Sequence, residues 1–131
     1  MNNNRQIFQI DKWYLNFLIF IASLNVFIQC INLLNRINGL KFVLLLLNIY
    51  IIVVCFKIKS IVLKVSIFIW ILLFMIPGFI GLFSVFGLIL IGRYDIYTNL
   101  YTFVTHLYHS VIGLILLIYF KNAITIEVVP K

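Results

Sequence analysis

The chain has 131 residues, of which 65% are hydrophobic and 10% charged, and its mean hydropathy is +1.20. A soluble domain carries about 25% charged residues, and a small domain has too much surface to bury so many apolar side chains. The composition therefore excludes a soluble globular protein. The net charge of +7 comes from Lys and Arg residues scattered between apolar runs, so we expect no nucleic-acid partner. The sequence predicts an all-α integral membrane protein whose surroundings are the lipid bilayer.

Four apolar segments predict four transmembrane helices, because a helix needs about 20 apolar residues to cross the hydrocarbon. They cover residues 13–34, 40–56, 65–91 and 100–120. The second segment is short, but Lys41 and Lys57 at its ends can extend their side chains to the interface. We expect residues 1–131 to form a single four-helix transmembrane domain.

The first and second segments each contain one cysteine, Cys30 and Cys55. The chain has no CxxC motif, and the two residues lie at different depths in the predicted topology. We expect both to be small buried hydrophobes.

The third segment is longer than one straight span requires and has Pro77-Gly78 in its middle. Proline removes a helical hydrogen bond and clashes with the preceding turn, so we expect a kink near Ile76. A tilted, kinked span accommodates the extra length. The alternative is a hairpin of two half-spans, 65–76 and 79–91, that turns at Pro77.

The distribution of basic residues favours four spans. With four spans, one side of the membrane holds Arg5, Lys12, Lys57, Lys59, Lys64, Lys121 and Lys131, and the other holds Arg36, Lys41 and Arg93. The hairpin alternative gives a weaker, six-to-four division. By the positive-inside rule, both termini are expected in the cytoplasm, and the membrane is expected to be the plasma membrane.

Polar residues form a stripe on the first and on the fourth segment, since positions i, i+4, i+7 and i+11 share one helix face. The first stripe consists of Asn25, Gln29, Asn32 and Arg36, and the second contains Thr102, His106 and His109. The two stripes lie at matching depths, so we expect them to meet if the two helices are neighbours. We call these seven residues the polar seam. It is interpreted either as interhelical hydrogen bonding or as a cavity for water or a ligand.

The two histidines are also the candidate metal ligands of the chain. Their i, i+3 spacing can place two imidazoles on one face, but a site requires three or four ligands. No carboxylate or cysteine lies nearby in the sequence. We therefore expect no metal and no cofactor.

Small residues recur every third position in the third segment, at Gly78, Gly81, Ser84 and Gly87. Small side chains let helix backbones approach closely, so this stripe predicts a helix-packing face. The alternative is a binding site at a broken helix around Pro77-Gly78.

The acidic residues, Asp11, Asp95 and Glu127, all lie outside the spans. Acid–base chemistry by paired carboxylates is therefore unsupported, and adjacent helical residues such as His109 and Ser110 point apart. We expect a non-enzymatic accessory, regulatory or protective (immunity-like) membrane subunit that binds another membrane protein or a second copy. The alternatives are a small solute or ion permeation protein using the polar seam, and a metal- or redox-linked membrane enzyme. After the fourth span, residues 124–129 have a strand-like sequence.

Overall fold

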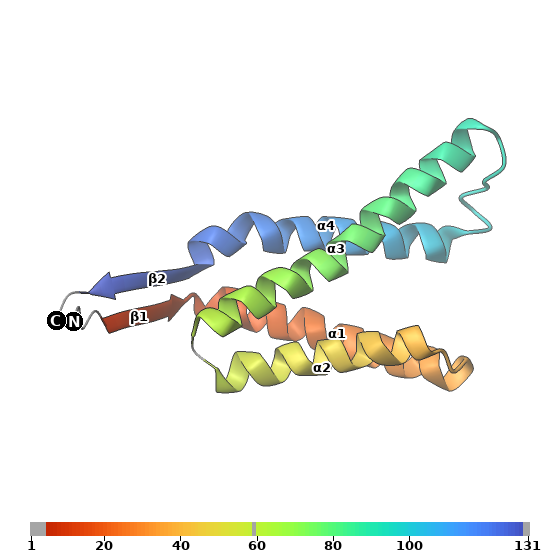
Figure 1. The fold of residues 1–131 in the computed structure, drawn as a ribbon. Coiled ribbons are helices and arrows are strands. Elements are labelled where there is room, and N and C mark those ends of the chain that lie inside the picture. The colour runs from red at the N-terminus through yellow and green to blue at the C-terminus, as the bar shows by residue number, and fades with distance from the viewer. Residues whose placement is uncertain (1–4, 59, 130–131) are drawn as a thin grey trace. The chain divides into compact units, whose positions relative to one another are not determined.

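The computed structural model describes residues 5–58 and 60–129 (Figure 1). This part of the chain contains, in order, β1 (Arg5–Ile10), α1 (Lys12–Asn35), α2 (Gly39–Lys57), α3 (Ile61–Leu90), α4 (Leu100–Ala123) and β2 (Ile124–Val129). The four described helices are all long and apolar enough to cross a membrane. The protein is thus predominantly helical, and these helices indicate an integral membrane protein.

The helix bounds are close to the predicted spans except at α3, which begins at Ile61, four residues before the expected start. Its first turn is capped by Ser60, whose Oγ accepts a hydrogen bond from the Val62 amide at 3.3 Å. The helix then continues through Pro77 to Leu90. The hairpin alternative is therefore wrong, because the chain does not turn back at Pro77.

Residues 36–38 connect α1 to α2, and residues 91–99 connect α3 to α4. Asn38 caps α2, since its Oδ1 accepts a hydrogen bond from the Leu40 amide at 3.0 Å. Between α3 and α4, Gly92 has a φ of 66°, a conformation that glycine adopts without steric cost. Asp95 then forms a turn in which its Oδ1 accepts from the Tyr97 amide at 3.0 Å.

The two ends of the chain pair with each other. β1 and β2 are antiparallel, with Arg5 opposite Val129 at one end and Ile10 opposite Ile124 at the other. The Asp11 amide donates to the Ala123 carbonyl at 2.9 Å, which extends the pairing to the first turn of α1 and the last turn of α4. The strand at 124–129 was expected from the sequence, and its partner β1 was not. The ladder places the start of α1 and the end of α4 side by side.

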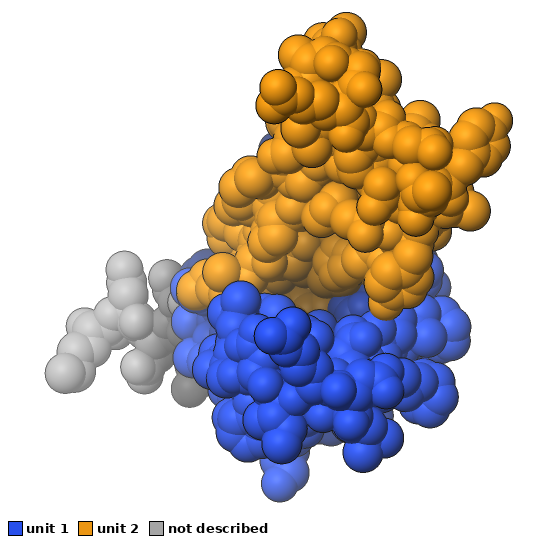
Figure 2. Space-filling model, turned by 90° about the vertical axis from the view of Figure 1, so that its right-hand side faces the viewer, with its two compact units in different colours: residues 1–67, 119–131 blue, residues 68–118 orange. Residues whose placement is uncertain are grey.

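The contacts divide the chain into two compact units, coloured in Figure 2. Unit 1 comprises residues 1–67 and 119–131, and unit 2 comprises residues 68–118. In unit 1, α1 packs along α2, and the fully buried side chains include Tyr14, Leu18, Ile51, Leu63, Ile67 and Ile124. In unit 2, the buried side chains include Trp70, Ile71, Phe74, Val85 and Leu116.

Cys30 and Cys55 are both free thiols, but only Cys55 is buried. The expectation that both are buried is wrong for Cys30, which is exposed on α1. The physical reason is that lipid is as apolar as a protein interior, so a small apolar side chain on a membrane helix gains nothing from burial against another helix.

Candidate functional site: the glycine–histidine contact

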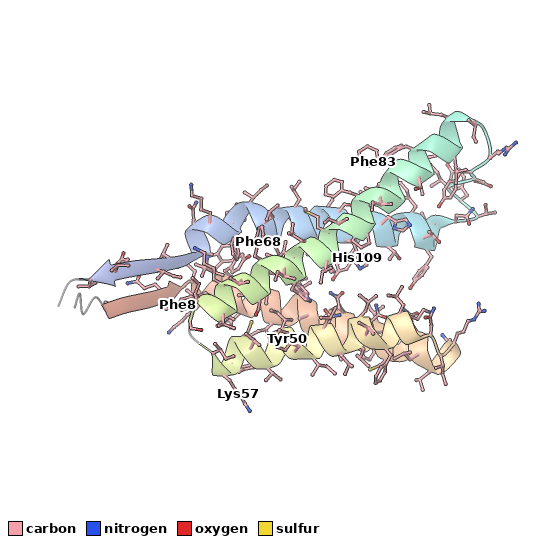
Figure 3. All side chains as sticks on the ribbon, in the orientation of Figure 1. Phe8, Tyr50, Lys57, Phe68, Phe83 and His109 are labelled. Atoms are coloured by element: carbon pink, nitrogen blue, oxygen red, sulfur yellow. The ribbon has the colours of Figure 1, made fainter. Side chains whose placement is uncertain are left out.

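α3 and α4 approach closely in unit 2, where Gly78 meets the backbone of α4. A Cβ atom added at Gly78 would lie 2.7 Å from the His109 Cβ and 2.8 Å from the Ser110 nitrogen. Cβ atoms do not come this near to backbone atoms, so no side chain fits at Gly78 without moving the helices apart. Figure 3 labels His109 on α4 where that helix passes α3.

One turn along α3, Gly81 faces His106. A Cβ added at Gly81 would overlap the His106 imidazole, with Nδ1, Cε1 and Cγ as its nearest atoms. The imidazole therefore occupies the space that a larger residue at position 81 would need. The absence of a side chain at Gly81 is what admits the His106 ring between the helices.

The two contacts follow one antiparallel register. Gly78 and Gly81 are three residues apart, as are His106 and His109, and the pairs run in opposite directions. A third contact lies one turn before Gly78 on α3, where a Cβ at Gly113 of α4 would lie 2.6 Å from the Met75 Cβ. Each helix thus contributes glycine where the other contributes a large side chain. We call this set, Met75, Gly78, Gly81, His106, His109 and Gly113, the glycine–histidine contact.

His109 is held by a hydrogen bond along its own helix. Its Nδ1 lies 2.7 Å from the Thr105 carbonyl oxygen. A carbonyl oxygen can only accept, so Nδ1 carries the hydrogen and donates it. In the neutral imidazole this leaves Nε2 as the acceptor nitrogen. Thr105 in turn donates its hydroxyl to the Tyr101 carbonyl at 2.7 Å, so the polar groups of this face bond mainly to the helix backbone.

The His109 ring belongs to an aromatic cluster. The Phe74 ring centroid lies 4.6 Å from that of His109, with the planes tilted by 39°. Phe74 stacks on Trp70 at 5.3 Å and meets Tyr108 edge-on at 5.7 Å. This cluster was not predicted from the sequence. Its signal was the i, i+4 spacing of Trp70 and Phe74, which places both rings on one face of α3.

Of the predicted small-residue stripe, Gly78 and Gly81 contact α4. Ser84 is exposed and donates its hydroxyl to the Ile80 carbonyl at 2.9 Å. Within the described residues, a Cβ at Gly87 would meet no atom inside 4 Å. In Figure 1 the last part of α3 leads away from α4, so the close approach ends after Gly81.

The polar seam residues have different surroundings. On α1, Asn25 is buried, Gln29 and Asn32 are half-buried and Arg36 is exposed. On α4, Thr102 is exposed, whereas His106 and His109 are half-buried. These α1 residues belong to unit 1 and these α4 residues to unit 2. The pairing of the two stripes stays a prediction.

Two buried polar atoms lack a hydrogen-bond partner in the described part of the chain, Gln29 Oε1 and Ser110 Oγ. Within the same described ranges, no three or more His, Cys, Asp or Glu residues lie close enough together to hold a metal ion. The histidines instead contact glycine and aromatic rings. Chemically, the arrangement can join two helices through a shape-matched, partly polar contact.

No protein-family model matches the chain, and no curated protein or solved structure is significantly similar to it.

Proposed function

We propose that this protein is a non-enzymatic accessory, regulatory or protective subunit, of the immunity-like kind that acts by binding another membrane protein. The observation that carries the proposal is the glycine–histidine contact. An ionisable residue inside a membrane helix is a functional candidate by default. In this chain both such histidines pack against glycines of the next helix, the arrangement of polar and small residues that holds membrane bundles together.

Exposed side chains supply the surface for a partner. On α3, beyond the glycine–histidine contact, Phe83 is 75% exposed and Leu90 is 87% exposed. Large aromatic and aliphatic groups of this kind pack equally well against lipid or against another membrane helix. They support a function in which the helices recognise a partner within the bilayer.

The proposed orientation has both termini in the cytoplasm of a cell whose plasma membrane contains the protein. It is supported by the seven basic residues on the terminal side against three on the other. The β1–β2 ladder agrees with an even number of spans, since paired strands lie on one side of a membrane. We also propose that α3 bends near Ile76, because Pro77 cannot donate the helical hydrogen bond at its position.

Orientation is tested with single cysteines in a chain whose Cys30 and Cys55 are replaced by alanine. A cysteine at Thr125 is expected to react with a membrane-impermeant maleimide only in inside-out vesicles, and one at Asn38 only in right-side-out vesicles. The reverse pattern overturns the orientation, and labelling of both on one side overturns four spans. The bend is tested by oriented solid-state NMR of amides on either side of Pro77, which should report two helix tilts that become one in Pro77→Ala.

The function is tested by purification in mild detergent from the native membrane, followed by quantitative mass spectrometry. A membrane protein should travel with the wild-type chain, and its own activity or sensitivity should change when the chain is absent. Phe83→Ala should weaken the association, whereas Thr125→Ala, an exposed change on β2 outside the helices, should not.

Two results would replace the proposal. Flux of ions or small solutes through liposomes that contain only this chain, altered by His106→Ala, would make it a permeation protein. A purified sample with stoichiometric metal or a visible absorbance band would make it a metal- or redox-linked membrane enzyme.

A further inference from the structure

The ribbon formed by β1 and β2 adjoins the first turn of α1 and the last turn of α4. In Figure 1, β1 leads into α1 and β2 continues out of α4. Each strand has six residues, which at about 3.3 Å per residue gives a length of about 20 Å. Among the described residues, the sheet contains these two strands and no third. Each strand therefore has one edge whose backbone groups are not paired within the sheet.

The ladder register shows which backbone groups face outward. The Asp11 amide donates to Ala123, the residue opposite it in the continued register. Hydrogen-bonded and non-hydrogen-bonded pairs alternate in an antiparallel ladder. By this alternation Phe8 and Ile126, which lie opposite each other, form a non-hydrogen-bonded pair. Their N–H and C=O groups point away from the ladder, to the two outer edges.

The edge strand β2 is suited to adding another strand. Five of its six residues, in the sequence ITIEVV, are β-branched, the type that favours strands. Val128 is 55% exposed, and Thr125 and Glu127 are also exposed. Proteins protect such edges with charged residues, above all lysine, and with proline or bulges. The one charged residue of β2 is Glu127, and the strand contains no lysine, proline or bulge. A two-stranded ribbon alone is also marginally stable in water.

We propose that the ribbon is a self-association site, in which β1 of one copy pairs edge to edge with β2 of the next. The occupant of each edge is thus a second copy of this chain. The proposal does not depend on the proposed accessory function, because it concerns the extramembrane ribbon and not the helices.

Insertion in one membrane restricts how two copies can pair. Copies with the same orientation are related by a rotation about the bilayer normal. For strands that lie along the bilayer normal, this rotation leaves the two β2 strands running in the same direction, so they pair in parallel. β1 runs toward the helices and β2 away from them, so β1 of one copy and β2 of another pair antiparallel, which is the slightly more stable arrangement.

Charge favours the same choice. β2 carries Glu127 and no basic residue, and β1 carries no acidic residue. A parallel β2–β2 pair in register would set Glu127 beside its own copy, and like charges side by side on neighbouring strands are unfavourable. The β1–β2 pairing places a β1 strand between the two β2 strands, so the Glu127 carboxylates of neighbouring copies are two strands apart. Such a contact is head-to-tail, so it continues from copy to copy until a ring closes.

The decisive experiment blocks each edge separately with proline. Phe8→Pro and Ile126→Pro remove outward-facing N–H groups, and the intrachain ladder does not use these donors. Phe8→Ala and Ile126→Ala are the matched controls, since they shorten the side chain and keep the N–H. The number of copies per particle is measured by native mass spectrometry of the full chain in lipid nanodiscs, and hydrogen exchange of the Ile7 and Glu127 amides reports whether the ladder has formed.

We expect the wild type and both alanine controls to associate and each proline variant to be monomeric. A mixture of the two proline variants should give dimers and nothing larger, because one partner retains its β1 edge and the other its β2 edge. A monomeric wild type overturns the proposal, as does an unchanged assembly in either proline variant. If the Phe8→Pro variant forms dimers when it is measured by itself, like strands pair, and the proposal is overturned. A strand from another polypeptide on the ribbon, in place of a second copy, also overturns it.

A second measurement covers the case in which a proline variant does not form its ladder. It uses a chain without either proline change, in which Thr125 is replaced by cysteine and Cys30 and Cys55 by alanine. A nitroxide at Thr125 should be separated from that of the next copy by two strand spacings, about 10 Å. This distance broadens the continuous-wave EPR spectrum, and dilution with unlabelled chain should remove the broadening. A spectrum without broadening at high protein density contradicts the pairing.

Discussion

The imidazole of His106 lies where a side chain at Gly81 would have to be. This relationship explains an ionisable group in the middle of an apolar helix without assigning it a ligand. The neighbouring helix provides space for the ring by having no side chain, and van der Waals packing of this kind is a main source of helix association in membranes.

Gly81→Leu should destabilise the protein, because the new side chain and the His106 ring cannot occupy the same volume. Overpacking of this kind costs about 1–3 kcal/mol. Gly87→Leu is the matched control on the same helix, since a Cβ at Gly87 meets no described atom within 4 Å. The free energy of unfolding is measured by SDS titration in mixed micelles. Equal losses in the two variants would show that Gly81 is not a contact position.

Gly81 and His106 should also be energetically coupled. In a His106→Ala background the ring is gone, so Gly81→Ala should cost less than it does in the wild type. Residues in direct contact show coupling energies of about 0.5–3 kcal/mol. A double-mutant cycle measures this quantity, with Gly81→Ala and His109→Ala as the comparison pair. Additive losses for Gly81 and His106 would contradict the observed contact.

His109 should stabilise the protein mainly through the packing of its ring and less through its hydrogen bond. His109→Phe keeps the contacts with Phe74 and loses the hydrogen bond to the Thr105 carbonyl within α4, a bond that contributes about 0.5–1.5 kcal/mol. His109→Ala loses both the bond and the ring contacts, each aromatic pair being worth about 0.5–1.5 kcal/mol. We therefore expect the alanine variant to be the less stable of the two in thermal unfolding. If the phenylalanine variant is equally unstable, the imidazole nitrogen matters more than the packing.

The ladder between the chain ends should be detectable by a disulfide. Cysteines at positions 8 and 126 lie opposite each other, and side chains of a non-hydrogen-bonded pair are close enough to cross-link. Oxidation of Phe8→Cys/Ile126→Cys, in a chain lacking Cys30 and Cys55, should join the two terminal peptides in mass spectrometry. Phe8→Cys/Thr125→Cys is the control, because neighbouring strand residues point to opposite faces. Cross-linking in the control alone would mean that the register is shifted by one residue.

Hydropathy was enough to predict the helices, because the length of an apolar run is set by the thickness of the bilayer. It was less exact at Ile61–Lys64, where a helical turn precedes the most apolar residues and contains Lys64. Spacing also placed Gly78 and Gly81 on one face and His106 and His109 on one face. That these two faces meet depends on which helices are neighbours, and this information is not contained in either helix alone.

β1 was missed for a similar reason. The sequence RQIFQI has few of the β-branched residues that identify β2, and a strand at an edge takes much of its stability from its partner. The partner is more than a hundred residues away in sequence. Local pattern therefore identified one strand of the pair and gave no sign of the other.

The ladder also sets an order of events during biogenesis. β1 is synthesised before any of the four described helices, and β2 only after the last of them. Their pairing closes the longest loop in the described chain, the kind of contact whose entropy cost must be met by earlier structure. It can form only when both strands are on the same side of the membrane. Ladder formation would therefore be the final step of folding, and a chain with one helix left uninserted would lack it.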